Sequence, residues 1–215
     1  MDTLSLFDFD KAQIHRLGAG FLLGIDEAGR GPLAGPVVAC ACHIPPCLAS
    51  LLMDVNDSKK LTERKRNEIF ERLQQMNIPY GVGFASAAEI DRLNILQATF
   101  LAMRRAAQRF INLPQAVALV DGPHLVAGLE LRQEPVVDGD AKSLAIAAAS
   151  IIAKVTRDRY MAGLDVLYPG YDFAGHKGYG TAKHMRALSR LGPCKEHRTS
   201  FAPVRKLLTP PALLP

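Results

Sequence analysis

Short apolar runs, separated by glycine, proline and acidic residues, recur along this chain and predict strands. The runs at 20–27 and 34–44 flank a short connection that contains Pro32 and Leu33, so we expect them to pair as a hairpin. Three further runs are expected to form strands: the alternating segment Tyr80–Phe84, the apolar segment Ala116–Val120 and the shorter segment Pro135–Val137. The sequence therefore predicts five strands.

Segments with helical periodicity and capping residues lie between these strands. Thr62 is placed to cap one helix, and Ser86 with Glu89 forms the capping box of another. Pro169 and Gly170 would end a long helix rich in alanine and isoleucine. The expected helices run from Thr62 to about Met76, from Ser86 to about Phe110 with a break near Asn94, from about Ser143 to Leu167, and from about Ala182 to Leu191.

The expected elements follow the order β-β-α-β-α-β-β-α, which builds a central sheet covered by helices. We therefore predict an α/β fold whose sheet and main helices lie in residues 1–167. Residues 168–215 would add a loop rich in glycine, lysine and tyrosine, a short helix and a proline-punctuated tail, packed on the same domain.

Composition narrows the class of protein. The chain has 215 residues, 48% of them hydrophobic, a net charge of +5 and a pI near 9.1, which permits a polyanionic partner. It has no apolar stretch of the ~18 residues that a membrane span needs, and the N-terminal Met1–Leu4 carries acid where a signal peptide carries base. We expect a cytoplasmic protein that does not enter the membrane. The four cysteines form no CxxC pair, so we interpret them as reduced thiols.

Acidic residues recur where the apolar runs end. Asp26 and Glu27 close the first strand, Asp121 closes the run that begins at Ala116, and Asp140 stands just before the long helix. Strand ends gather at one edge of an α/β sheet, so Asp26 and Asp121 would meet there if their strands are neighbours. Converging carboxylates repel one another unless cations are present, and oxygen ligands favour Mg²⁺ or Mn²⁺. Two such ions would suit phosphodiester hydrolysis.

Each acid also has a purely structural interpretation. Asp121 begins an Asp-Gly-Pro sequence typical of a turn, Asp140 could be a favourable charge near a helix N-terminus, and Glu27 could be solvated. The Gly-Arg-Gly sequence that follows at 29–31 favours a site, because it can bring backbone amides and a guanidinium close to an anion.

Basic and aromatic residues supply candidate contacts to a phosphate chain. Arg30 could bind an anion or satisfy loop carbonyls, while Ser58 and Lys59 lie in a charged segment that is either a phosphate contact or a solvated turn. In the segment 176–181, Lys177 supplies charge and Tyr179 a ring that could stack on a base or sugar. Tyr179 could equally be a half-buried loop anchor.

Long motifs of the chain resemble those of ribonuclease HII, the bacterial type 2 ribonuclease H. The resemblance covers about residues 20–206. It is carried by GIDEAGRGPLAGPVV (24–38), DSKKLT (57–62), EIDRLNILQAT (89–99), VDG (120–122), GDAKSLAIAAASIIAKVTRDR (139–159), YPGYDFAGHKGYGTAKH (168–184) and HRTSFAPV (197–204).

The resemblance implies a ribonuclease H-like fold with a five-stranded mixed sheet and a small helical C-terminal region. It implies a metal site of four acids, Asp26, Glu27, Asp121 and Asp140, with Asp26 bridging two ions. The substrate would be RNA paired with DNA, including single ribonucleotides embedded in duplex DNA. The Gly29–Arg30–Gly31 backbone would contact the ribose 2′-hydroxyl, and Tyr179 would recognise the junction from RNA to DNA.

Cleavage is expected on the 5′ side of a ribonucleotide, by two-metal catalysis that leaves a 3′-hydroxyl and a 5′-phosphate. Two alternatives stay open: a silent hybrid-binding protein that uses its acids structurally, and a DNA-specific nuclease of the same fold. We expect a monomer. Some bacterial members of the family bind the replication sliding clamp, and no motif of this chain indicates that contact.

Overall fold

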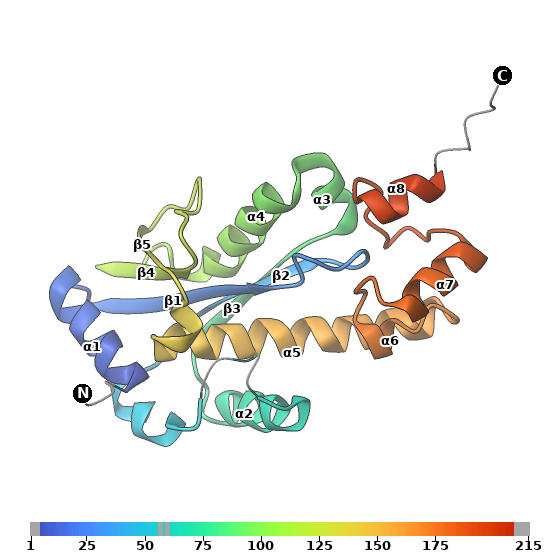
Figure 1. Cartoon of the computed structure of the whole chain (residues 1–215). Helices are drawn as coiled ribbons and strands as arrows, with labels where there is room; N and C mark the ends of the chain where they lie inside the picture. Colours follow the sequence, from blue (N-terminus) through green and yellow to red (C-terminus); the bar gives the residue numbers. More distant parts are fainter. Residues whose placement is uncertain (1–4, 56–57, 59–60, 209–215) are drawn as a thin grey trace.

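A mixed five-stranded sheet lies at the centre of the part of the chain that the computed structural model describes, residues 5–55, 58 and 61–208 (Figure 1). The strand order is β3-β2-β1-β4-β5. The first three strands in the chain pair antiparallel, whereas β4 lies parallel to both β1 and β5, so the expected mixed sheet is confirmed. The strands are β1 (Phe21–Ala28), β2 (Val37–Cys42), β3 (Tyr80–Ala85), β4 (Ala116–Asp121) and β5 (Arg132–Val136).

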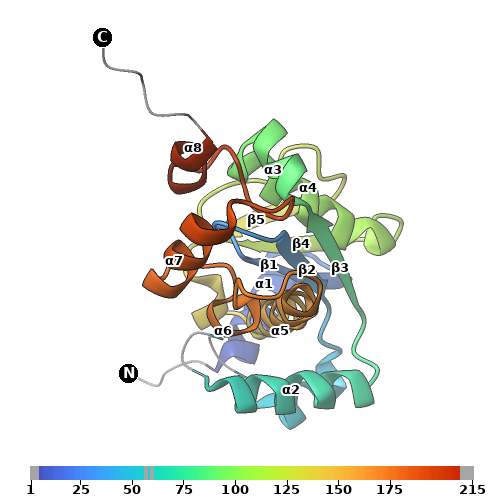
Figure 2. The same ribbon diagram turned by 90° about the vertical axis from the view of Figure 1, so that its right-hand side faces the viewer.

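Helices cover both faces of this sheet. In Figures 1 and 2, α3 and α4 lie on one face, and α5 lies on the other between the sheet and α2. The helices are α1 (Leu6–Leu17), α2 (Glu63–Gln75), α3 (Ala87–Leu93), α4 (Ile95–Ala107), α5 (Leu144–Leu167), α6 (Phe173–His176), α7 (Ala182–Leu191) and α8 (Ala202–Leu208). Short 3₁₀ helices are η1 (Pro46–Leu52), η2 (Gln108–Phe110) and η3 (Gly139–Ala141).

The long helix α5 packs closely against β1. A Cβ atom at Gly24 would lie 2.1 Å from the carbonyl carbon of Ala145, so only glycine permits this approach. The buried, alanine-rich side of α5 completes the core on this face of the sheet and carries Ser150 towards the end of β1. Although α5 has 24 residues, the described residues contain no helix apolar enough over sufficient length to cross a membrane.

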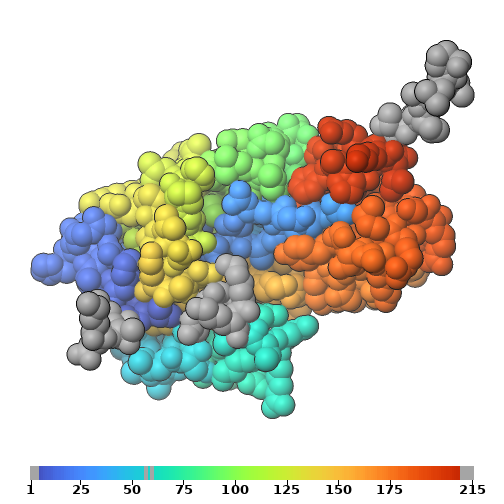
Figure 3. Space-filling view, in the orientation of Figure 1, coloured from blue at the N-terminus to red at the C-terminus, as the bar shows by residue number. Residues whose placement is uncertain are grey.

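The C-terminal segments enclose the hairpin between β1 and β2. Leu33 packs in one buried cluster with Met161 of α5, Phe173 of α6 and Leu188 of α7. Ala34 forms an isolated antiparallel bridge with His197, which ties the hairpin to the chain before α8. In Figure 3 the orange and red C-terminal segments flank the light-blue hairpin on two sides.

Among the described residues, the structure adds three helices that the hydrophobic pattern did not predict: α1, α8 and the short α6 within the expected loop. Helix α1 begins after a capping box of Ser5 and Asp8, and Gly18, which has a φ of 59°, caps its C-terminus. Helix α8 begins directly after Phe201, where a tail without helix was expected. The expected break near Asn94 is confirmed, because Asn94 has a φ of 71° and its side chain caps α4.

Strand boundaries differ by one or two residues at several ends and by three residues at the starts of two strands. Strand β2 begins at Val37 instead of residue 34, because Ala34 bridges His197 and Gly35 has a φ of 79°. Strand β5 begins at Arg132 instead of Pro135, since its polar residues pair with β4 at the edge of the sheet.

Candidate active site

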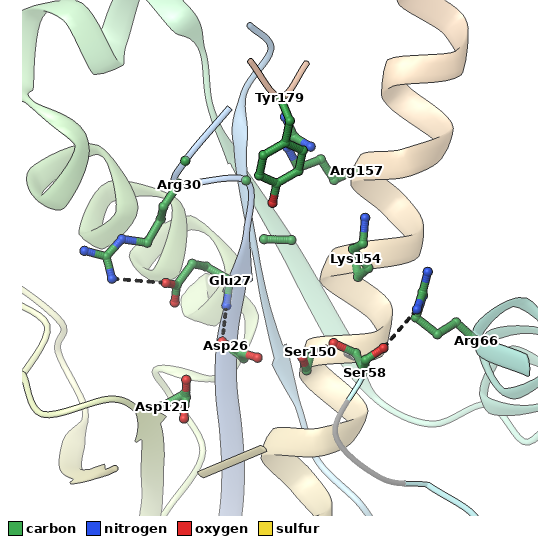
Figure 4. Close-up of a pocket in the computed structure, with 13 residues that line it drawn as sticks. Asp26, Glu27, Arg30, Ser58, Arg66, Asp121, Ser150, Lys154, Arg157 and Tyr179 are labelled. Atoms are coloured by element: carbon green, nitrogen blue, oxygen red, sulfur yellow. Dashed lines mark hydrogen bonds and ion pairs between the residues drawn. The ribbon is translucent and has the colours of Figure 1, made fainter. Parts of the chain in front are cut away.

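Two acids meet at the ends of the neighbouring parallel strands β1 and β4. Ile25 lies opposite Val120 in the register, so Asp26 and Asp121 follow side by side. Both line a cavity of about 280 Å³, together with Glu27 (Figure 4). The two strands are therefore neighbours, which is the condition under which the two acids were expected to meet.

Asp26 lies deepest among the lining acids and is only 5% exposed. Its Oδ1 accepts a hydrogen bond of 2.6 Å from the backbone N–H of Glu27. Burial, followed by the negative charges of Glu27 and Asp121, raises the pKa of Asp26 well above its usual range. A cation in this cavity would relieve the same repulsion, so the donor set suits a hard divalent ion.

A pair of serines connects Asp26 to the far wall of the cavity. The hydroxyl oxygens of Ser58 and Ser150 lie 2.9 Å apart, and Ser150 also hydrogen-bonds to Asp26. When Asp26 is ionised, as with a bound cation, its carboxylate can only accept, so Ser150 would donate to Asp26 and Ser58 to Ser150. The carbonyl oxygen of Ser58 accepts from Nη1 of Arg66 at 2.9 Å, which fixes Ser58 relative to α2.

Asp140 lies next to this site, but its role as a metal ligand stays a prediction. The backbone N–H of Gly139 donates to Oδ1 of Asp121 at 2.7 Å, which places η3 against the acids. The Asp140 side chain is 4% exposed and is not among the residues that line the cavity. Within the described ranges, no group of three or more histidine, cysteine or acidic side chains is already arranged to hold a metal ion, so ion binding by the acids of this cavity would require their side chains to move closer together.

The Gly29–Arg30–Gly31 loop forms the rim of the cavity. Gly29 has a φ of +96°, and a Cβ at this position would lie 2.0 Å from Nε of Arg157. The Arg30 guanidinium lies 3.4 Å from Oε1 of Glu27, so this arginine pairs with an acid of the site rather than with loop carbonyls. A Cβ on Gly31 would lie 3.7 Å from the ring of Tyr179.

Cations on α5 and α2 line the wall opposite the acids (Figure 4). Lys154 and Arg157 extend from α5, and Arg66 extends from α2. No role of these residues was predicted from the sequence. The spacing of Ser150, Lys154 and Arg157 at i, i+4 and i+7 puts them on one helix face and was a usable signal.

Tyr179 and Lys177, two of the predicted substrate contacts, line different depressions of the surface. Tyr179 lines the cavity and is 46% exposed, so its ring is available for stacking. Lys177 instead lines an adjacent depression, and its Nζ lies 3.9 Å from Oε1 of Glu63. Ser58 lies in the cavity wall, whereas Lys59 falls outside the described residues.

Two hydrogen-bonded histidines, His184 and His197, support the Tyr179 loop. The carbonyl oxygen of Tyr179 lies 2.9 Å from Nδ1 of His184, whose Nε2 lies 3.1 Å from Nε2 of His197. The N–H of Cys194 donates to Nδ1 of His197 at 3.0 Å. One set of neutral tautomers satisfies all three contacts, with His197 donating to His184 and His184 donating to the carbonyl. Burial lowers the pKa of both rings, that of His197 to about 4, which favours this neutral state.

Solved structures with the same chain path define the class of protein. The archaeal ribonuclease HII of Archaeoglobus fulgidus, solved with PCNA, aligns with a TM-score of 0.66 at 25% identity, covering 84% of this chain and 95% of that chain. Bst-RNase HIII, solved with Mn²⁺, aligns with a TM-score of 0.73 at 19% identity, covering 90% of this chain and 71% of that chain. The fold is therefore the ribonuclease H-like α/β fold, as expected.

The family follows from sequence comparison. The family model for Ribonuclease HII matches residues 23–204, and this chain belongs to that family. The ribonuclease HII of Halorhodospira halophila is 52% identical over 89% of this chain and 96% of its own length. That of Syntrophotalea carbinolica is 51% identical over 91% of this chain and 92% of its own length. The chain is thus a hydrolase of the endoribonuclease class.

Proposed function

We propose that this chain hydrolyses the RNA strand of RNA–DNA hybrids and incises 5′ of single ribonucleotides embedded in duplex DNA, leaving a 3′-hydroxyl and a 5′-phosphate. The main support for the proposal is that Asp26, Glu27 and Asp121 line the same cavity as the Gly29–Arg30–Gly31 loop and Tyr179. The acids could hold the divalent ions that act on the reacting phosphate. The loop and the tyrosine ring could contact a ribose and the nucleotides beside it.

Divalent ions are part of this proposal. Asp26, Glu27 and Asp121 would hold two ions, Mg²⁺ or Mn²⁺, with Asp140 as the fourth ligand; this extends the Mn²⁺ of Bst-RNase HIII to this chain. When bound, the ions supply the Lewis-acid chemistry that phosphodiester hydrolysis requires. The serine pair Ser58 and Ser150 would keep the Asp26 carboxylate oriented towards the cavity through the hydrogen bond from Ser150.

The protein's own cations would hold the strand around the reacting phosphate. Lys154 and Arg66 line the wall opposite the acids, so flanking phosphates would lie between this wall and the loop at 29–31. Arg157 also lines this wall, but it is 1% exposed and its guanidinium donates to backbone carbonyls. Binding through such contacts weakens as salt rises, because each phosphate contact releases counterions. Lys177 belongs to this surface only through the adjacent depression, beside Glu63.

The partner in this proposal is nucleic acid, bound by a monomer. The Archaeoglobus fulgidus protein was solved with PCNA, and a sliding-clamp contact of this chain is compatible with the proposal without being part of it.

Three duplexes separate this function from its alternatives. They are a long RNA–DNA hybrid, a DNA duplex with one ribonucleotide and the matching all-DNA duplex, each with Mg²⁺, Mn²⁺ or EDTA. We expect metal-dependent cleavage of the first two alone. Cleavage of the all-DNA duplex would indicate a DNA nuclease, and hybrid binding without any cleavage would indicate a silent binding protein.

Asp121→Asn tests the metal site. The substitution keeps the side-chain shape and removes one charge, so we expect cleavage to fall at least about a hundredfold, as when a group that stabilises developing charge is lost. Hybrid affinity should stay within about threefold. Asp165→Asn on α5, outside the residues that line the cavity, is the matched control. Normal turnover by Asp121→Asn would remove this residue from the metal site.

A further inference from the structure

Arg198 is a buried arginine whose neighbours are backbone carbonyls rather than acids. Its side chain is fully buried before α8, and it donates to three carbonyl oxygens of the hairpin between β1 and β2. The distances are 2.6 Å to Gly29, 2.8 Å to Arg30, and 3.0 and 2.9 Å to Gly35. The guanidinium thus binds the loop that forms the rim of the active site.

The direction of these bonds determines the direction of the loop amides. In a trans peptide the C=O of one residue and the N–H of the next point in opposite directions. Because the carbonyls of Gly29 and Arg30 point inward to Arg198, the N–H groups of Arg30 and Gly31 point away from it. Arg30 and Gly31 are exposed and line the cavity, so their amides face the side from which a substrate enters.

The surrounding contacts hold Arg198 in place. Its own N–H donates to the carbonyl of Leu33 at 2.8 Å, and its guanidinium lies over the ring of Phe201 at 5.1 Å. The carboxylate of Asp91 accepts four hydrogen bonds of 2.5 to 2.9 Å from the backbone and hydroxyl groups of Thr199 and Ser200. Hydrogen bonds therefore hold the backbone of Arg198 and of the two residues that follow it.

Arg157 holds the other side of the same hairpin. It donates to the carbonyls of Pro36 at 3.0 Å and Ala34 at 3.2 Å, and to that of Lys177, in the Tyr179 loop, at 3.0 Å. Burial and the charge of Arg157 lower the pKa of Arg198 to about 9. A planar guanidinium with five donors can bind several carbonyls at once, whereas an ammonium cannot reproduce that arrangement.

We infer that Arg198 is a positioning residue for ribose selection: it aims the amides of Arg30 and Gly31 at the 2′-hydroxyl side of the bound strand. This inference rests on the proposed function, because it assigns the means by which the proposed site distinguishes a ribonucleotide from a deoxyribonucleotide. Arg198 is not among the described residues that line the cavity, so it would act through the loop.

The test measures selectivity rather than activity alone. Dissociation constants are measured for a DNA duplex with one ribonucleotide and for the matching all-DNA duplex, with Ca²⁺ in place of Mg²⁺ and the absence of cleavage checked. The ratio of the two constants is the ribose preference. We expect Arg198→Lys, which keeps the charge, to lower this preference at least about fivefold, consistent with the loss of one or more oriented hydrogen bonds. The all-DNA constant should change less than about threefold.

Controls separate positioning from general structural support. Arg132→Lys is matched, because Arg132 donates to the carbonyl of Leu17 at 2.7 Å outside the residues that line the cavity, and it should leave the preference unchanged. An unchanged preference in Arg198→Lys, or equal weakening on both duplexes, would overturn the inference. If Arg198→Lys does not fold, Asp91→Ala, which releases the neighbouring backbone, decides: a reduced preference supports the inference and an unchanged one overturns it.

The wild-type measurement distinguishes this failure from that of the proposed function. A wild-type protein that neither prefers nor cleaves the ribonucleotide duplex refutes the proposed function, and the inference with it. A wild-type preference that survives in Arg198→Lys refutes the inference alone.

Discussion

Gly29→Ala probes the closest packing at the rim of the site. Gly29 has a φ of +96°, and an added Cβ would lie 2.0 Å from Nε of Arg157 and 2.4 Å from its Cδ. A left-handed backbone costs an L-residue about 1–2 kcal/mol. The clash would also displace a buried guanidinium, and each hydrogen bond to a charged group that is lost costs about 1.5–3 kcal/mol. We expect a total destabilisation of about 3–5 kcal/mol.

Gly122→Ala is the matched control for this substitution. Gly122 has a φ of +94°, and nothing lies within 4 Å of a Cβ added there, so it carries the backbone cost without the clash. Urea unfolding of both variants should show Gly29→Ala to be less stable than Gly122→Ala by about 2–3 kcal/mol. In thermal scans this difference corresponds to a midpoint lower by roughly 4–12 °C. Equal losses in the two variants would show that the contact with Arg157 costs nothing and would refute the packing argument.

Three further predictions concern recognition, binding and pH. Tyr179→Ala should reduce incision at a single ribonucleotide more than cleavage of a long hybrid, and equal losses in steady-state assays would argue against junction recognition. Lys154→Met, which removes a cation from the cavity wall, should weaken hybrid binding and lower the slope of log affinity against log salt by up to about one. Asp10 is 3% exposed, and burial raises its pKa to about 6 from 3.8. A raised pKa contributes stability below pH 3.8 that is lost as pH rises through about 6. Urea unfolding should therefore show Asp10→Asn gaining up to about 3 kcal/mol relative to wild type between pH 4 and pH 8, and a pH-independent difference would contradict this.

The strands and the acids at their ends were predictable, because they depend on local patterns, whereas the neighbouring position of β1 and β4 was only a condition. Apolar runs mark buried strands, and an acid at the end of such a run marks the edge where sites form. The pairing of Ile25 with Val120 then brings the two carboxylates together. The break at Asn94 was likewise predictable from local capping signals.

The support of the site depends on contacts that local patterns do not encode. The bonds from Arg198 to Gly29 join residues 169 positions apart, and a buried arginine that binds only carbonyls has no charge partner to reveal it in the sequence. Lys177 was a candidate substrate contact in the sequence, but the structure does not place it in the cavity. It lies in a loop with a left-handed φ of 52°, and its ammonium is near the carboxylate of Glu63. The placement of Asp140 as a fourth ligand stays a prediction.

The 169-residue reach of Arg198 orders events during synthesis. A ribosome releases the chain from its N-terminus, and domains begin to fold as they emerge. The acids at 26 and 121 leave the ribosome well before residue 198, so a nascent chain can assemble its sheet while the rim at 29–31 still lacks its guanidinium. The hydrogen bonds from Arg198 to this rim would thus form only after both acids have left the ribosome.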